Sequence, residues 1–226
     1  MSLALLSLVP SLAVAPAPSV SAASAELRSL LVEAAASRGD VDAARADALV
    51  AELAAARVPF DAALLGATDA VPSGLWRASY TAGAPPPRWE RNARRLGFFR
   101  NRAGQAYDAS TGRVANYGEV AGPSVYFTAC GSFTERDASV ARCPKDYDVA
   151  IEEGGFVLFG RPFLSSAISG PGFLRVLYLD EDLRIFESPT DSPDTGRDVT
   201  GEKGVWESAG LKVVQVREAA FETVKS

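Results

Sequence analysis

The chain has 226 residues, with 23 lysines and arginines against 28 aspartates and glutamates, which gives a formal net charge of −5 at pH 7. This acidic balance, without a long basic run, argues against a nucleic acid partner. The sequence contains no histidine, so the commonest general base, the Ser-His-Asp and Cys-His arrangements and zinc sites built on imidazole are all excluded. Gly-x-Ser-x-Gly, Gly-x-Gly-x-x-Gly and phosphate-loop motifs are missing too. We therefore expect a binding or structural protein, not an enzyme, with no metal site and no resident cofactor.

Residues 1–25 form an apolar leader that carries no charged side chain. A bilayer span needs about 18 or more apolar residues, and Pro10, Pro16 and Pro18 interrupt this run well before that length. The leader is similar to the hydrophobic part of a signal sequence, although the usual basic start is missing. We expect either a targeting segment or a retained segment that contacts other molecules.

Residues 26–57 have the pattern of a helical hairpin. Four apolar residues at helical spacing form one stripe in its first half: Leu27, Leu30, Leu31 and Ala34. Gly39 suits the left-handed position that ends a helix, and Asp40 suits the N-cap of the next one. This hairpin is expected to cover one end of a β domain; a partner-binding role is the alternative.

Residues 58–226 are expected to form one β domain, because short alternating segments follow one another about every ten residues with turn residues between them. The first strand places Trp76, Ala78 and Tyr80 on one face. Further strands are expected at 105–117 (two strands and a turn), 124–133, 147–151, 155–163 and 210–217. Two more, within 172–186, are joined by the acidic tip 180–182, which we expect to be a solvated turn and not a calcium loop.

An arginine-rich loop follows the first strand, after a proline triplet that excludes regular structure. Its arginines and tryptophan suit contact with lipid headgroups or an acidic partner; the alternative is a solvated charge cluster with the tryptophan folded onto the core. The candidate contact residues are Arg88, Trp89, Arg91, Arg94 and Arg95.

One octet, Tyr178-Leu-Asp-Glu-Asp-Leu-Arg-Ile185, closely resembles the C-terminal signature of the plastid lipid-associated proteins, or fibrillins. The Arg38-Gly39 pair between the two helical halves and the Cys130-Gly-Ser-Phe-Thr segment are also similar to that family. Gly74-Leu75-Trp76 resembles the Gly-x-Trp that opens lipocalins. The resemblance implies a lipocalin-like antiparallel β-barrel preceded by an N-terminal α-helical hairpin, in a plastid (chloroplast) and associated with thylakoids.

The resemblance implies two alternative functions. One is a protein that holds a lipid, quinone, carotenoid or chlorophyll in the barrel, at the thylakoid or the plastoglobule. The other is a structural subunit that docks on a thylakoid photosystem or antenna complex. The aromatic residues expected to line a ligand site are Trp76, Tyr80, Phe127, Phe156 and Tyr178.

Two further expectations concern single residues. Trp76 should be buried beneath the barrel, under an arginine of a late strand: Arg175, Arg184 or Arg217. Cys130 and Cys143 either form a disulfide or, as favoured for a reducing plastid stroma, remain two separate thiols.

Overall fold

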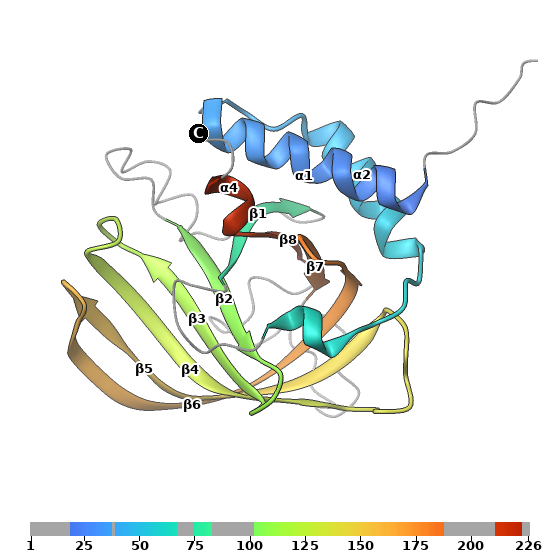
Figure 1. The fold of residues 1–226 in the computed structure, drawn as a ribbon. Helices are drawn as coiled ribbons and strands as arrows, with labels where there is room; N and C mark the ends of the chain where they lie inside the picture. Colours follow the sequence, from blue (N-terminus) through green and yellow to red (C-terminus); the bar gives the residue numbers. More distant parts are fainter. Residues whose placement is uncertain (1–18, 38, 67–74, 83–101, 188–210, 223–226) are drawn as a thin grey trace, which may run out of the picture.

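The computed structural model describes residues 19–37, 39–66, 75–82, 102–187 and 211–222, without the side chains at 169–171 and 222. Its strands close into an antiparallel barrel in sequence order, with β1 also paired to β8 (Figure 1). The strands are β1 (Trp76–Ala82), β2 (Ala103–Asp108), β3 (Arg113–Glu119), β4 (Val125–Glu135), β5 (Lys145–Leu158), β6 (Arg161–Leu179), β7 (Leu183–Glu187) and β8 (Lys212–Arg217). The predicted class, a mainly β protein with a closed barrel behind a helical pair, is confirmed.

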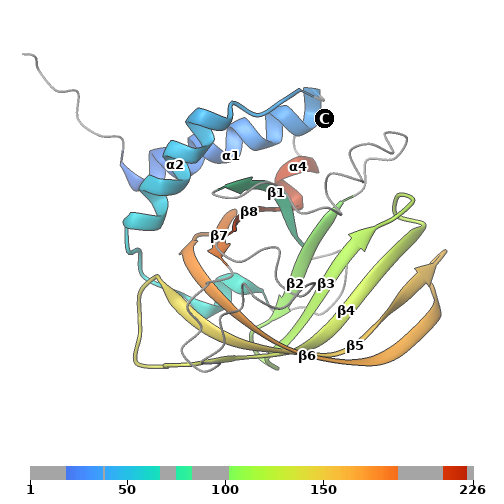
Figure 2. The same ribbon diagram turned by 180° about the vertical axis from the view of Figure 1, so that it is seen from behind.

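The helices α1 (Val20–Ser37) and α2 (Ala43–Ala55) run in opposite directions across the barrel wall formed by β7, β8 and β1 (Figures 1 and 2). Their apolar stripes bury Leu27 and Leu49 against Ile185 of β7. The helices therefore cover an outer wall of the barrel. The sequence pattern had predicted that they would cover one end of it. Among the described residues, no helix combines the length and apolar character needed to cross a membrane.

The helix ends differ from those expected. The first helix begins at Val20, inside the apolar leader. Asp42, not Asp40, is the N-cap of α2, since its side chain accepts the backbone N–H of Arg45 at 3.1 Å. The backbone N–H of Gly39 donates to the Ser37 hydroxyl at 3.2 Å.

The hairpin of β5 and β6 is longer than the sequence indicated. The segments expected at 147–151 and 155–163 are parts of one strand, the turn after it and the first residues of β6, because β5 continues through Gly154 and Gly155 to Leu158. Phe159 and Gly160 form the two-residue turn, with φ of 49° and 76°. Positive φ at both central residues is typical of a type I′ hairpin.

Two β-bulges reverse which face of a strand points inward. In β1 the pairing with β8 shifts between Ala78 and Tyr80, and in β6 the pairing with β7 shifts between Val176 and Tyr178. Side chains alternate between the inner and outer faces of the barrel along each strand, and the bulge inverts which positions face inward from that point on. Tyr80 therefore leaves the face of Trp76, which corrects the single face predicted for this strand.

The bulges divide the apolar side chains between two cores. The inner core lies inside the barrel, and the outer core lies between the barrel wall and the helices. The 3-10 helix η1 (Ala62–Leu65) contributes Leu65 to the inner core, while α4 (Ala219–Glu222) contributes Phe221 to the outer one.

Trp76 is the largest fully buried side chain and lies in the inner core. Its Nε1–H donates to the Leu65 carbonyl at 2.8 Å, and the guanidinium carbon of Arg217 lies 4.0 Å from its ring centroid. Burial of Trp76 under a late-strand arginine is thus confirmed. Arg175 is on another part of the surface, where its Nε is 2.8 Å from Asp146.

Replacing Trp76 with alanine should lower the free energy of unfolding by about 3–5 kcal/mol, because a buried aromatic side chain leaves a cavity in the inner core. Urea unfolding of the full chain measures this change. Phe163→Ala, at a side chain that is 64% exposed, is the control and should stay within about 0.5 kcal/mol of the parent. Equal losses for both variants would contradict the assignment.

Candidate functional site

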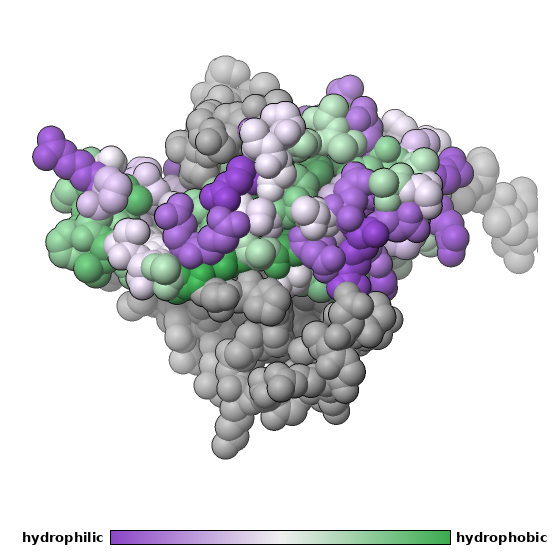
Figure 3. Space-filling view, turned by 90° about the horizontal axis from the view of Figure 1, so that it is seen from below, coloured by the Kyte–Doolittle hydropathy of each residue, from purple (hydrophilic) through white to green (hydrophobic). Residues whose placement is uncertain are grey.

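Exposed apolar side chains gather at one end of the barrel. Of the large hydrophobic residues that the structure describes as exposed, all except Val20 lie in β4, β5 or β6 or in the turns next to them. Hydrophobic residues collect on the same side in the view from below, where the β5–β6 hairpin projects (Figure 3). They are Val120, Phe127, Phe156, Phe159, Phe163, Leu164 and Ile168.

Several of these side chains face the inside of the barrel. Phe133 belongs to the inner core, and Phe127 lies six residues before it on the same unbroken alternation of β4. Phe127 is directly opposite Phe156, and Phe156 is opposite Leu164. Residues directly opposite in antiparallel strands project to the same face. The two phenylalanine rings, 6.1 Å apart, therefore form an open aromatic end of the inner surface.

Small residues occupy the next level of the inner surface, towards the middle of the barrel. Gly118 is opposite Phe127, and Ala129 is opposite Gly154. A methyl group added to Gly118 would meet only the Phe127 ring, at 3.7 Å, whereas one on Gly154 would approach Ile168 to 2.6 Å. The inner surface therefore has room beside Gly118, between the aromatic end and the polar residues deeper in the barrel, whereas the Ile168 side chain covers Gly154.

A buried polar cluster, which we call the arginine centre, consists of Arg184, Gln105, Gln215, Tyr107 and Asn116. The Arg184 Nη2 donates to the side-chain oxygens of both glutamines. The Gln105 amide donates to Asn116 at 2.8 Å, and the Tyr107 hydroxyl donates to the Gln105 oxygen at 2.9 Å. Arg184 is 0% exposed, and burial lowers the pKa of its guanidinium.

The predicted ligand-lining residues separate into two groups. Phe127 and Phe156 come together at the open end, and Trp76 lies deeper, in the inner core. Tyr80 and Tyr178 do not join them, because the bulges turn both towards the helices. The Tyr80 hydroxyl donates to Asp47 of α2 at 2.8 Å, and that of Tyr178 donates to Asp180 at 2.8 Å.

The sequence interpretation missed the ligand potential of Gln105, Arg184 and Gln215. The signal available was a charged residue between Leu183 and Ile185 in an apolar strand, at a position that the period-two pattern allows to face the interior. Arg88, Trp89, Arg91, Arg94 and Arg95 lie outside the described residues, as do residues 1–18 of the leader.

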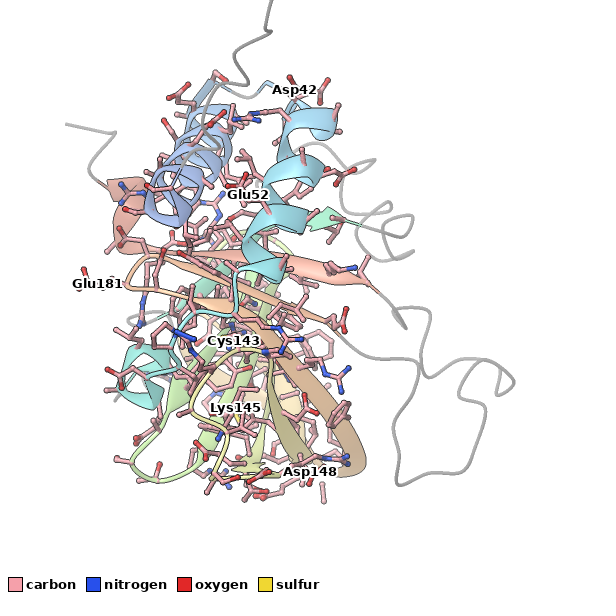
Figure 4. The ribbon with its side chains drawn as sticks, turned by 90° about the vertical axis from the view of Figure 1, so that its right-hand side faces the viewer. Asp42, Glu52, Cys143, Lys145, Asp148 and Glu181 are labelled. Atoms are coloured by element: carbon pink, nitrogen blue, oxygen red, sulfur yellow. The ribbon has the colours of Figure 1, made fainter. Side chains whose placement is uncertain are left out.

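The acidic tip between β6 and β7 is a docking point for α1 and not merely a solvated turn. Asp180 accepts the Ser24 hydroxyl and the backbone N–H groups of Asp182 and Leu183, the latter two at 2.9 and 2.7 Å. Asp182 forms an ion pair with Arg28 of α1. Glu181 points away from the barrel (Figure 4).

Asp180→Ala should destabilise the protein by at least about 1.5–3 kcal/mol, the range for hydrogen bonds to a charged group. Glu181→Ala removes the adjacent carboxylate, whose side chain is exposed, and should change the free energy of unfolding by less than about 0.5 kcal/mol. Thermal and urea unfolding provide the measurement. A smaller effect at 180 than at 181 would show that this turn does not hold α1.

Cys130 and Cys143 are both free thiols, which excludes the disulfide alternative. Cys143 is buried in the inner core near the middle of the molecule (Figure 4), whereas Cys130 neighbours the inward Gly131 and so faces outward. Burial raises the pKa of the Cys143 thiol to about 11, so it is protonated and unreactive at neutral pH.

No cluster of three or more metal-ligating side chains occurs within the described ranges. No protein-family model, curated protein or solved structure matches this chain.

Proposed function

We propose that the protein is a non-enzymatic binder of apolar molecules, with the aromatic end of the barrel as its binding site. The observation that carries this proposal is the inward pair Phe127 and Phe156, which are 38% and 42% exposed although they line the concave face of a closed barrel. Ligand sites are typically concave and apolar with a few polar groups, and barrel mouths are frequent locations.

The free energy of burial supports an apolar occupant. Removing apolar surface from water contributes roughly 25 cal/mol per Å² to the free energy of binding. An apolar molecule that covers the exposed aromatic rings and Leu164 would therefore bind favourably. The small residues Gly118 and Ala129 next to them limit crowding from the wall. A lipid, quinone, carotenoid or chlorophyll has the required apolar surface.

The octet from Tyr178 to Ile185 supports a relationship to the plastid lipid-associated proteins and hence a place at the thylakoid or plastoglobule. Each part of it has a distinct structural task here: Asp180 fixes the turn and α1, Leu183 and Ile185 pack under the helices, and Arg184 enters the barrel. A segment in which several residues each have a separate structural role supports a family relationship more strongly than a short surface motif does.

The tip of the β5–β6 hairpin suits peripheral contact with a membrane. From Gly154 to Leu174 the only charged residue is Arg161, although the chain as a whole is acidic. Phe159 at the turn is 80% exposed and has a φ of 49°, which is unfavourable for a bulky side chain. An aromatic ring beside one arginine matches an anionic lipid surface. Docking on a photosystem or antenna complex through this tip is the alternative.

Phe127→Ser in the full-length chain should weaken binding of the neutral apolar dye Nile red at least ten-fold, because it replaces an aromatic contact with a hydroxyl group. Tyr126→Ser is the matched control: it is the adjacent residue, it faces the other side of β4, and it should leave the dissociation constant unchanged. Fluorescence titration gives both constants. Equal weakening by the two variants, or no dye binding to the parent protein, would argue against the proposed site.

Phe159→Gly should reduce cosedimentation with phosphatidylglycerol vesicles roughly ten-fold, since burying a phenylalanine contributes about 1.5–3 kcal/mol. Glycine also relaxes the positive φ, so a loss of binding cannot be attributed to unfolding. Val20→Ser, at the exposed apolar residue remote from the tip, should bind as the parent does. Binding to isolated thylakoids but not to vesicles would favour docking on a protein complex.

A further inference from the structure

Arg184 is a fully buried cation that has no carboxylate partner among the described residues. Its side chain is 0% exposed, and a guanidinium has five N–H donors. Nη2 donates to Gln105 and Gln215. Nε and Nη1 have no hydrogen-bond partner in the described structure. The arginine centre therefore holds a positive charge and unused donors inside the barrel.

Other buried or half-buried cations of the chain are compensated differently. Lys145 has Nζ at 2.9 Å from Glu135 and donates to two backbone carbonyls at 2.7 and 2.8 Å. Arg102 lies 2.6 Å from Glu119 and 2.9 Å from Glu218. Tyr107 and Tyr147, which act to raise the pKa of Arg184, are not carboxylates, and the Arg217 guanidinium nearby is a like charge. Arg184 thus departs from the pattern that desolvated charges follow.

The surrounding rings compensate this charge only in part. The guanidinium carbon lies 4.3 Å from the Tyr107 ring, 4.9 Å from the Phe186 ring and 5.8 Å from the Trp76 ring. Aromatic faces attract a cation through their quadrupole. That attraction does not provide in-plane acceptors for the N–H groups of Nε and Nη1. A negatively charged acceptor would both accept these hydrogen bonds and compensate the positive charge.

The arginine centre and the aromatic end lie on one continuous inner surface. Gln105 bonds to Asn116, which is opposite Ala129 on β4. One inward position further along lie Gly118 and Phe127. A molecule along this face would meet a cationic head site, then small residues, then aromatic rings. That order of groups matches an amphiphile with an anionic head and an apolar tail.

We propose that Arg184 binds the carboxylate of a long-chain fatty acid or of a similar apolar monoanion whose tail reaches the aromatic end. This inference rests on the proposed function, because it assumes that apolar ligands enter the barrel. A carboxylate carries one negative charge and only accepts hydrogen bonds. These properties match a guanidinium that has one positive charge and free N–H donors. Arg217, the nearby cation, is already engaged by the carbonyls of Leu64 and Glu181.

Titrating the delipidated full-length protein with oleate and with oleyl alcohol, which has the same tail and a neutral head, tests the inference. The parent protein should bind oleate at least ten-fold more tightly than the alcohol. Arg184→Met, a substitution of similar length, should abolish this preference by weakening oleate binding at least ten-fold. Arg175→Met removes an outer arginine that is paired with Asp146 and should retain the preference.

The outcomes separate the two proposals. If the parent binds neither ligand, the proposed function fails. If it binds both equally, or if Arg184→Met keeps the preference for oleate, the proposed function stands and the role of Arg184 is refuted.

A measurement on the parent protein avoids dependence on a variant that fails to fold. The ¹³C resonance of bound carboxyl-labelled oleate should stay that of the ionised form at pH values where free oleate becomes protonated, because the guanidinium favours the charged carboxylate. A bound carboxyl that titrates as the free acid does would overturn the inference.

Discussion

The register of β7 is the constraint on which both cores of this protein depend. Leu183 and Ile185 project into the outer core beneath the helices, while Arg184 and Phe186 project into the barrel. A shift by one residue would exchange the two sets and place a guanidinium among the leucines of α1 and α2. The turn at Asp180 prevents this shift, because its carboxylate accepts two backbone N–H groups and its own N–H donates to the Leu183 carbonyl at 3.0 Å.

The bulges in β1 and β6 extend the same division to the neighbouring strands. Before the bulge in β1, Trp76 faces the interior; after it, Tyr80 faces α2. In β6 the corresponding pair is Val176 and Tyr178. One continuous strand can therefore line the barrel at one end and hold the helices at the other. The barrel wall under the helices is packed on both sides, whereas β4, β5 and the first part of β6 extend beyond the helices with an exposed apolar inner face.

Local pattern predicted much of this fold, and its failures have physical causes. Period-two alternation identified the strands around Trp76 and Val214 correctly, because each has one or both faces buried over a regular stretch. It failed at Tyr80 and Tyr178, since a bulge is a property of two paired strands and leaves no fixed signal in one of them. The sequence also predicted two separate segments where β5 is continuous through residues 152–154; at Gly155 the missing side chain allows close approach of the β6 backbone, since an added methyl carbon would lie 2.1 Å from the Leu164 carbonyl.

The sequence predicted the aromatic residues of the candidate site but not the arginine centre, again because pairing between strands is not visible in one segment. Phe127 and Phe156 were recognisable as aromatic residues in strands, but their inward orientation depends on the alternation from Phe133 along β4 and on a register shift in the β4–β5 pairing between Cys130 and Gly131. The arginine centre needs residues from β2, β3, β7 and β8, which are brought together only by barrel closure.

Closure also places the open aromatic rings at the end of the barrel where the β5–β6 hairpin projects. If that hairpin meets a bilayer, an apolar tail can pass between lipid and barrel with little exposure to water. The buried guanidinium then favours ligands with an anionic head. In the proposed function the two features have separate roles: the rings would provide affinity for an apolar chain, and Arg184 would discriminate among the head groups.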